Sequence, residues 1–261
     1  MQKEAKQKGE CVIITSTKEL MARYSEVGQG DIFAGKLGTG GLKNFLLIDL
    51  LERGVSCVPS PLSQIISGSK VVQALLLNKW MLPNTHVISR RKNLIDAISR
   101  YNRLEIESVI TKEDRMHCGF GIRKWDSVET LYSFISMSES SYPFVLQPFM
   151  ENFTDIRVVV ARDYVEAYTR HNPDNFRMNM AAGGSSSPFL LDEEKEKFCR
   201  AVMDRGRFPF AHIDILIDSD GKYYLSEIAL EGGIKGASIG RAELDKKKEE
   251  AIDSIIKKLS W

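Results

Sequence analysis

The chain has 261 residues, of which 43% are hydrophobic and 27% charged, and its formal net charge at pH 7 is +1. This composition is typical of a folded globular protein, and the balanced charge gives no sign of a nucleic-acid or membrane partner. No window approaches 18 apolar residues, and the polar start lacks the apolar core of a signal peptide. The four cysteines are far apart and form no CxxC pair, as in reduced cytoplasmic proteins. We therefore expect a soluble, cytoplasmic protein.

Residues 1–65 are expected to form a small α/β lobe. Apolar runs at 11–16 and 55–60 indicate short strands, and a third strand is expected within the glycine-rich stretch 28–41, at 31–37. Between them, residues 42–54 have apolar side chains at helical spacing and end on Gly54, a helix stop signal.

Residues 66–150 alternate between helices and strands. A helix is predicted over 70–80 with Ser69 as its N-cap, and further helices over 91–101 and 127–138. Strands are predicted at 85–89, 106–112 and 144–150. This alternation predicts the first half of an α+β body.

Residues 151–261 contain mostly strands, which are expected at 155–161 and 164–171 and in a hairpin near 212–228. A Gly/Ser-rich loop is expected at 183–187, and helices at 192–206 and 242–259. The pattern as a whole predicts an α+β body behind a small α/β lobe.

The hairpin carries one carboxylate in each arm, Asp214 and Glu227, around the turn 218–221. A loop of two or four residues places Asp214 opposite Leu225 and Glu227 opposite His212. Both carboxylates then share one face of the hairpin, whereas a loop of three or five residues breaks this arrangement. The opposite face becomes an apolar stripe of Ile213, Ile215, Ile217, Tyr224 and Ile228.

Two interpretations of these carboxylates stay open on spacing alone. Converging carboxylates repel each other unless a cation lies between them, and Mg²⁺ prefers such oxygen ligands together with phosphate oxygens. Alternatively, both side chains simply face solvent on a half-exposed sheet.

The order of several segments resembles the ATP-grasp fold, in particular the RimK-like (glutathione synthetase-like) carboxylate–amine ligases. "IDIL" (213–216) and "LSEIALEGGIKG" (225–236) resemble the metal-binding end of that fold. "VITKEDRMHCGFGI" (109–122) resembles its strand lysine and glycine-rich loop, and "VLQPFME" (145–151) resembles its hinge. "SGSKVVQALL" (67–76) and the segment 155–187 complete the resemblance, which covers residues 65–240.

The resemblance implies a nucleotide site and an ATP cofactor. Lys112 and Lys70 would neutralise phosphates, and glycines 119 and 121 would let backbone N–H groups approach them. The hinge would hold adenine, and Asp155 or Glu151 would bind the ribose. The cofactor-binding candidates are Lys70, Lys112, Gly119, Gly121, Gln147, Phe149, Met150 and Asp155.

The resemblance also implies the catalytic and metal residues. Arginines near the γ-phosphate and an acyl phosphate would match their oxygens with guanidinium groups. The catalytic candidates are Arg157, Arg170, Arg177 and Asn179, and the metal candidates are Asp214 and Glu227, with Mg²⁺ or Mn²⁺ as the ion. His171 and His212 lack partners at metal-ligand or triad spacing, so we expect structural roles for them.

Two residues depart from the family pattern. Ala229 stands where the family has an Asn metal ligand, and Pro148 stands in the hinge where many members have Glu. A water molecule can replace one Asn oxygen on Mg²⁺, and Glu231 could also turn toward the ion.

The resemblance predicts an Mg²⁺-dependent, ADP-forming ligase that joins a carboxylate, activated as an acyl phosphate, to the amine of an amino acid or peptide. A nucleotide-binding module that acts through a partner with little or no catalysis is the alternative, and phosphoryl transfer to a hydroxyl differs only in its product. Substrate identity depends on the loops at 28–41 and 171–187. The charged C-terminal helix can pack on its own body or on a second copy, so a homo-oligomer is allowed.

Overall fold

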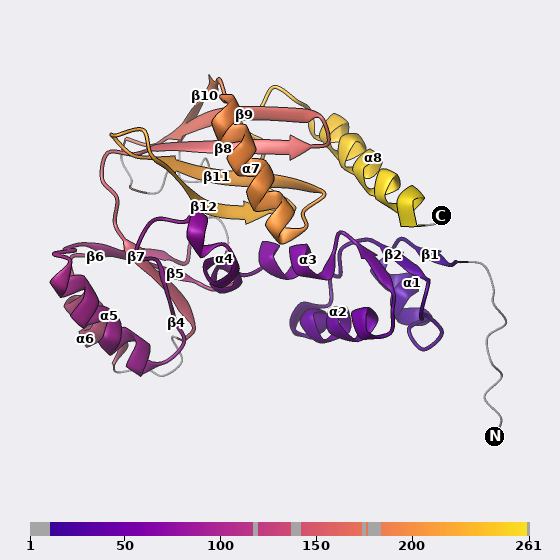
Figure 1. Ribbon diagram of the computed structural model, residues 1–261, viewed down its shortest axis with the longest axis horizontal. Coiled ribbons are helices and arrows are strands. Elements are labelled where there is room, and N and C mark those ends of the chain that lie inside the picture. The colour runs from indigo at the N-terminus through magenta and orange to yellow at the C-terminus, as the bar shows by residue number, and fades with distance from the viewer. Residues whose placement is uncertain (1–10, 117–119, 137–141, 174–175, 177–183, 260–261) are drawn as a thin grey trace.

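The computed structural model describes residues 11–116, 120–136, 142–173, 176 and 184–259. The described strands form three sheets, with strand orders β1-β2-β3, β4-β7-β5-β6 and β10-β9-β8-β11-β12. Figure 1 shows the five-stranded sheet lying across the other two, with α3 and α4 at the junction. Among the described residues, no helix has the length and apolar character needed to cross a membrane.

The first sheet is parallel and belongs to the N-terminal part of the chain. Its elements are β1 (Ile13–Ile14), α1 (Thr17–Ala22), β2 (Ile32–Ala34), the 3-10 turn η1 (Gly40–Leu42), α2 (Lys43–Glu52) and β3 (Ser56–Val58). Leu20, Leu47 and Leu50 of the helices are buried against Phe33 of β2. This core accounts for the helical apolar spacing of residues 42–54.

The four-stranded sheet is antiparallel. The elements of this region are α3 (Pro61–Ser67), α4 (Lys70–Leu76), η2 (Asn78–Trp80), β4 (His86–Ile88), α5 (Arg91–Arg103), β5 (Val109–Glu113), β6 (Ile122–Trp125), α6 (Val128–Ile135) and β7 (Phe144–Pro148). Helices α5 and α6 cover one face, where Leu94, Tyr101 and Leu131 pack on Phe144 and Leu146. The opposite face is directed toward β12 of the five-stranded sheet.

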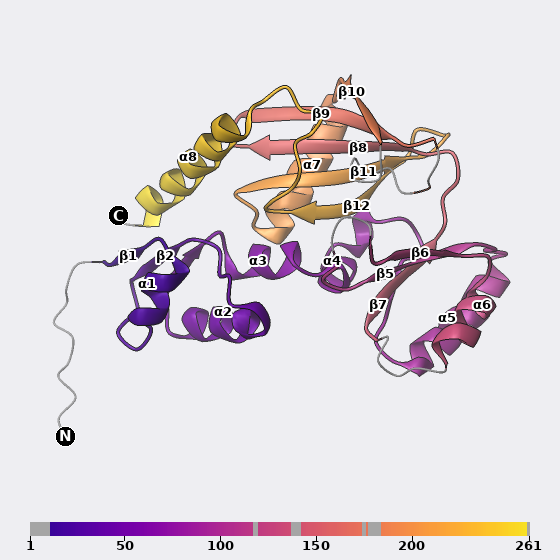
Figure 2. The same cartoon turned by 180° about the vertical axis from the view of Figure 1, so that it is seen from behind.

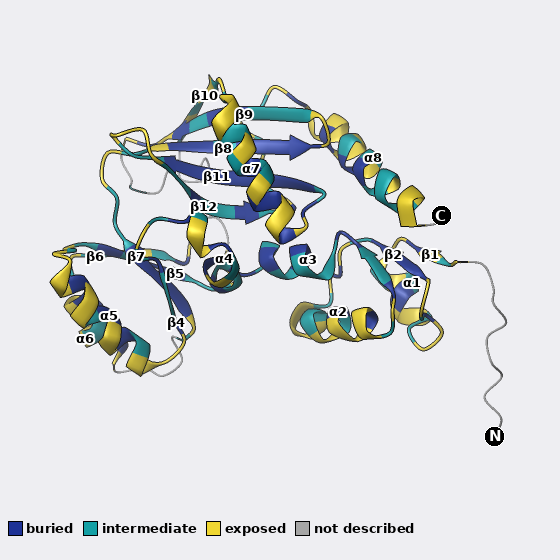
Figure 3. Cartoon of the chain, in the orientation of Figure 1, coloured by how far each residue is buried: buried dark blue, intermediate teal, exposed yellow. Residues whose placement is uncertain are grey.

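The five-stranded sheet is also antiparallel. The elements here are β8 (Thr154–Ala161), β9 (Tyr164–His171), β10 (Ser185–Phe189), α7 (Glu193–Gly206), β11 (Phe210–Ile217), β12 (Tyr223–Ala229) and α8 (Arg241–Leu259). Cys199, Val202 and Met203 of α7 share a core with Ile213 and other apolar residues of the sheet. Figure 3 shows the deep burial of β8 and β11, and Figure 2 shows α8 beside the sheet from behind.

The sequence analysis missed three elements, helices α1 and α3 and strand β6. It also placed Ser185–Ser187 in a loop, whereas these residues lie in strand β10. The signals for α3 were present, because Ser60 caps it by accepting from the Ser63 N–H and a proline opens it. Strand β10 forms because it pairs with β9, which compensates for a composition unfavourable to strands.

The predicted register of the hairpin is also wrong. Ile217 pairs with Tyr223, which leaves the five residues 218–222 between them. A register shift between Asp214 and Ile215 then places Asp214 directly opposite Glu227. A loop with an odd number of residues would place the two carboxylates on opposite faces, but the extra residue of this β-bulge restores the alternation. Both carboxylates therefore still share one face. Tyr224 pairs with Leu216, so it lies on the Asp214 face and not in the predicted isoleucine stripe.

Candidate active site

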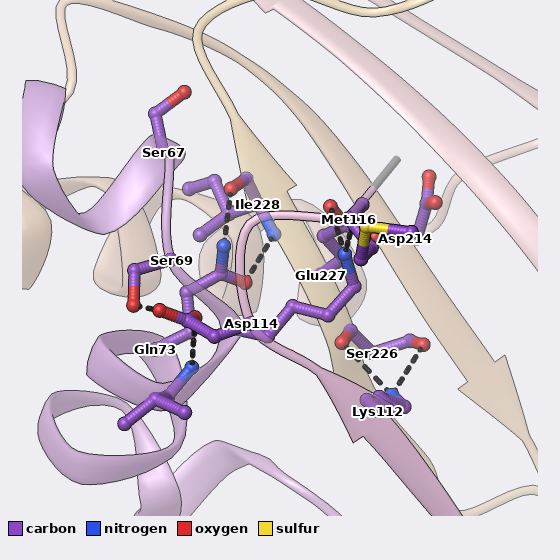
Figure 4. Close-up of polar contacts among 12 residues, drawn as sticks. Ser67, Ser69, Gln73, Lys112, Asp114, Met116, Asp214, Ser226, Glu227 and Ile228 are labelled. Atoms are coloured by element: carbon purple, nitrogen blue, oxygen red, sulfur yellow. Dashed lines mark hydrogen bonds and ion pairs between the residues drawn. The ribbon is translucent and has the colours of Figure 1, made fainter. Parts of the chain in front are cut away.

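Lys112 projects from β5 toward the hairpin. It pairs with Val145 of β7 on the sheet face that α5 and α6 leave free, and it is only 6% exposed. Its ammonium donates to the carbonyl and hydroxyl oxygens of Ser226, each at 3.3 Å (Figure 4). Burial lowers the pKa of Lys112 to about 8, against the opposing effect of the Glu227 charge. Lys112 is therefore a buried cation between the four-stranded and the five-stranded sheet.

The loop after β5 is anchored to the start of α4. The Asp114 carboxylate accepts hydrogen bonds from the Ser69 hydroxyl at 2.7 Å and from the Val71 N–H at 3.1 Å. A Cβ atom on Gly121 would lie 2.6 Å from the Met116 Cβ, so this close approach requires glycine. Gly119, the other predicted loop glycine, lies outside the described residues.

Lys70, the first residue of α4, faces both the loop and the hairpin. Its ammonium donates to the Met116 carbonyl and lies 3.7 Å from Oε1 of Glu227. The Lys70 side chain is 11% exposed and that of Glu227 is 33% exposed. The two predicted lysines therefore approach the predicted hairpin carboxylate from different elements.

Gln73 joins α4 to the free edge of β12. Its side-chain amide donates to the Ile228 carbonyl at 3.0 Å, and its oxygen accepts from the Ile228 N–H at 3.0 Å. This pair of bonds substitutes for a neighbouring strand beside Glu227, as Figure 4 shows. Gln73 thereby fixes the backbone that presents Glu227.

Asp214 lies in a buried ionic network with two arginines. Arg157 donates to both Asp214 oxygens, at 2.8 and 2.9 Å, and Arg170 lies 3.0 Å from Oδ2. Burial alone would raise the pKa of Asp214, but the two guanidinium groups outweigh it and hold that pKa well below its usual range. Arg170 also donates to Asp155 at 2.7 Å, and burial raises the pKa of Asp155 to about 6 despite this contact.

The predicted hinge follows β7. Gln147 is buried and pairs with Ile110, so it shares the sheet face of Lys112. The Phe149 N–H donates to the Ser108 carbonyl at 2.9 Å, and the Lys124 ammonium lies 3.8 Å from the centre of the Phe149 ring. Met150 is half-buried beside it. Three of the hinge candidates thus lie at the end of β7.

The remaining candidates lie elsewhere or cannot be placed. Arg177 and Asn179 fall outside the described residues. His171 is exposed, whereas His212 is buried, and neither of its ring nitrogens has a hydrogen-bond partner within the described part of the chain. Burial, with the charges of Lys248 and Arg157, lowers the pKa of His212 to about 3, which keeps the ring neutral.

Sequence reasoning missed several supporting residues. Asp114, Gln73 and Ser226 were not singled out, because their partners lie far away in the chain, 155 positions away in the case of Gln73 and Ile228. Glu231 was considered as a metal ligand, but its carboxylate pairs with Lys36 and accepts from Lys248 at 2.7 Å. These contacts connect the loop after β12 to the N-terminal lobe and to α8.

The oxygen ligands that the hairpin offers limit how a divalent ion can bind. Asp214 and Glu227 are directly opposite each other, but the next residue on that face of β12 is Ala229, whose partner is His212. Within the described ranges, no group of three or more His, Cys, Asp or Glu residues is placed to hold a metal ion. The described residues therefore offer two carboxylates to an ion that shares oxygens with a nucleotide, and they provide no ligand set for a second ion.

The fold is similar to that of several solved ATP-grasp proteins. D-cycloserine synthetase DcsG gives a TM-score of 0.60 at 11% identity, covering 94% of this chain and 100% of that one. D-alanyl-alanine synthetase A from Vibrio cholerae gives 0.57 at 13% identity, covering 85% of this chain and 77% of that one. The predicted fold class is confirmed.

Comparison of sequences identifies the family. A curated relative, the coenzyme gamma-F420-2:alpha-L-glutamate ligase of Methanocaldococcus jannaschii, is 26% identical over 92% of this chain and 86% of its own length. The alpha-aminoadipate–LysW ligase LysX of Saccharolobus solfataricus is 28% identical over 56% of this chain and 54% of its own length. Residues 68–252 match the RimK-like ATP-grasp domain. The chain therefore belongs to the RimK-like ATP-grasp family of carboxylate–amine ligases.

Proposed function

We propose that this chain uses ATP to phosphorylate a small carboxylate and then joins the resulting acyl phosphate to the amine of an amino acid or peptide. The observation that supports this most is the convergence of two lysines and two arginines on the hairpin, from α4, β5, β8 and β9. Three of these cations pair with Asp214 or Glu227, and Lys112 contacts Ser226 beside Glu227. Phosphoryl transfer depends mainly on positioning and on neutralising the charge of the transferred group. The site supplies cations for both purposes.

Each group has a proposed role. Lys70 and Lys112 bind nucleotide phosphates, helped by the glycine loop at residues 119 and 121. Gln147, Phe149 and Met150 hold the adenine. Arg157 and Arg170, with Arg177 and Asn179 as the resemblance implies, bind the γ-phosphoryl group and the acyl phosphate, because guanidinium groups match these oxygens. Asp155 supports Arg170 in this scheme, since their side chains are hydrogen-bonded.

Asp214 and Glu227 are the residues that we propose to face a divalent ion brought by the nucleotide. Such an ion would polarise the phosphoryl group and offset its charge. The carboxylate of Asp214 can accept further contacts, because a carboxylate has about four acceptor positions and Arg157 and Arg170 make three contacts with it.

We propose residues 66–150 and 151–261 as the two subdomains that grip the nucleotide, with the hinge at 145–151 and the lobe 1–65 beside the acceptor substrate. An acidic amino acid is the amine that we favour. The two relatives above are named for glutamate and alpha-aminoadipate. In addition, Lys36 and Lys248 pair with the carboxylate of Glu231 at the junction with this lobe, and Arg241 lies 4.0 Å from both Glu231 and Asp245. A further carboxylate would be accommodated there.

A nucleotide-binding module without catalysis is not favoured, because the curated relatives are named ligases and the described charged residues of the site are present. Phosphoryl transfer to a hydroxyl would leave a phosphorylated product and no new amide, so the product distinguishes it.

The test is ADP release with pairs of acids and amines. We expect turnover that requires both substrates and is highest with glutamate, aspartate or alpha-aminoadipate as the amine, and mass spectrometry should show an amide. Lys112→Ala should abolish it, whereas Lys79→Ala, which removes a lysine that lies over Trp80, should not. Unchanged turnover in Lys112→Ala would refute the assignment.

A further inference from the structure

Lys70 lies beside Glu227 at the capped start of α4. The Ser69 hydroxyl caps α4 by accepting from the Val72 N–H at 3.1 Å, and Asp114 binds both the Ser69 hydroxyl and the Val71 N–H. The Lys70 ammonium is further restrained by its hydrogen bond to the Met116 carbonyl. With an 11% exposed side chain and this hydrogen bond, Lys70 presents a positive charge to Glu227.

The two carboxylates of the hairpin are neutralised in different ways. Arg157 and Arg170 balance Asp214, and in the described part of the chain neither forms an ion pair with Glu227. Lys112 contacts the neighbouring Ser226 oxygens. Among the described residues, the ion pair of Glu227 is with Lys70. The charge of Glu227 is thus already balanced before any nucleotide arrives.

On the Glu227 face of β12, the next described residue offers no metal ligand. Ala229 follows Glu227 on this face of β12, and its methyl group cannot coordinate a cation. An ion placed at Glu227 would therefore have one protein carboxylate there and would lie close to the Lys70 ammonium. Like-charge repulsion and the missing donor both oppose a separate ion at this position.

We propose that Lys70 is a built-in counter-ion of Glu227 that takes the charge-neutralising place of a second divalent ion, so that the site binds one ion per nucleotide. This inference rests on the proposed nucleotide site. An ammonium group is a compact point charge with three donors, so it can contact a carboxylate and a nearby phosphate at the same time. The single ion is then the one that the nucleotide carries between Asp214 and Glu227.

The test is to count bound Mn²⁺ by electron paramagnetic resonance, using the full chain with a non-hydrolysable ATP analogue. We expect one ion per chain in the unmodified protein and also in Ala229→Asn, because Lys70 still occupies the position. The double variant Lys70→Met/Ala229→Asn should bind two. Lys70→Met alone should still bind one ion, because Ala229 supplies no ligand for a second.

Two controls separate a local effect from a general loss of structure. Lys70→Arg keeps the charge and should also retain one ion. Lys79→Met removes a lysine over Trp80 and should leave both the ion count and the affinity unchanged. Two ions in the unmodified protein or in Ala229→Asn would overturn the proposal, as would one ion in the folded double variant. Failure of the unmodified protein to bind the analogue would instead overturn the proposed function.

Discussion

The two arms of the hairpin use their carboxylates differently. On β11, the Asp214 side chain is 10% exposed and is contacted by two guanidinium groups from β8 and β9, in the same sheet. On β12, the Glu227 side chain is 33% exposed and lies 3.7 Å from Lys70 of α4. The first carboxylate is part of the sheet's internal structure, whereas the second meets elements from the other side of the site. A single hairpin therefore combines one carboxylate that is paired within its own sheet with one that is paired across the site.

The largest effect is expected from Asp214→Asn. The substitution leaves Arg157 buried without its anionic partner and Arg170 paired with Asp155 alone. Breaking a buried ion pair in this way costs about 3–5 kcal/mol. The free energy of unfolding in urea should fall by that amount. Asp220→Asn changes an exposed turn residue and should alter it by less than about 0.5 kcal/mol. A similar effect of both variants would show that the arginine network does not stabilise the fold.

Glu227→Gln should show the opposite pattern. Because the Glu227 side chain is one-third exposed and its ion pair with Lys70 is 3.7 Å long, the free energy of unfolding should change by less than about 1 kcal/mol. Turnover should nevertheless fall about 100-fold, since an oriented charge at the transferred phosphoryl group is lost. Glu249→Gln, on the exposed side of α8, is the matched control. A large loss of stability with normal turnover in Glu227→Gln would show that Glu227, like Asp214, serves mainly to stabilise the fold.

Gln73→Met tests whether α4 holds the β12 arm in place. The variant leaves the buried N–H and C=O of Ile228 without their side-chain partner, at a cost of about 1–3 kcal/mol for an unsatisfied buried group. Hydrogen exchange at the Ile228 amide should accelerate, and Gln29→Met at an exposed position should leave it unchanged. A protected Ile228 amide in Gln73→Met would mean that this bond is dispensable.

The smallest effect concerns pH. The pKa of Lys112 is lowered by burial to about 8, so the free protein loses this charge as pH rises above that value, whereas bound phosphate favours the protonated form. Nucleotide affinity should therefore fall above pH 8, by at most about tenfold per pH unit, with proton uptake on binding. Lys112→Arg keeps its charge and should remove this slope in calorimetry. An identical slope in both proteins would assign the titration to another group.

Much of the fold could be predicted from local patterns, because helical spacing and strand alternation follow from burial of one face. Residues 91–101 are an example: the spacing predicts a helix there, and α5 spans Arg91–Arg103 with Leu94, Ala97 and Tyr101 buried. The shared face of Asp214 and Glu227 was also expected, but for the wrong reason. An odd loop and an unpredicted bulge compensated each other, and neither has a clear signal in the residues involved.

The site was predictable only where a residue lies in a recognisable segment. Lys70, Lys112, Arg157, Arg170 and the hairpin carboxylates were singled out in this way, and the structure brings them together. Gln73 and Asp114 act through partners on distant segments, and tertiary packing, not spacing, sets those contacts. The ionic partners of Glu231 were unreadable for the same reason, since Lys36 belongs to the N-terminal lobe.

The most direct test is a crystal structure with a non-hydrolysable ATP analogue and Mn²⁺, with the ions located by anomalous scattering. We predict that the γ-phosphate lies between Lys112 and Arg170, and that one anomalous peak lies beside Asp214 and Glu227 while Lys70 keeps its contact with Glu227. Phosphates bound away from Lys112 and Arg170 would contradict the proposed active site, and a second peak at Glu227 would contradict the counter-ion role of Lys70.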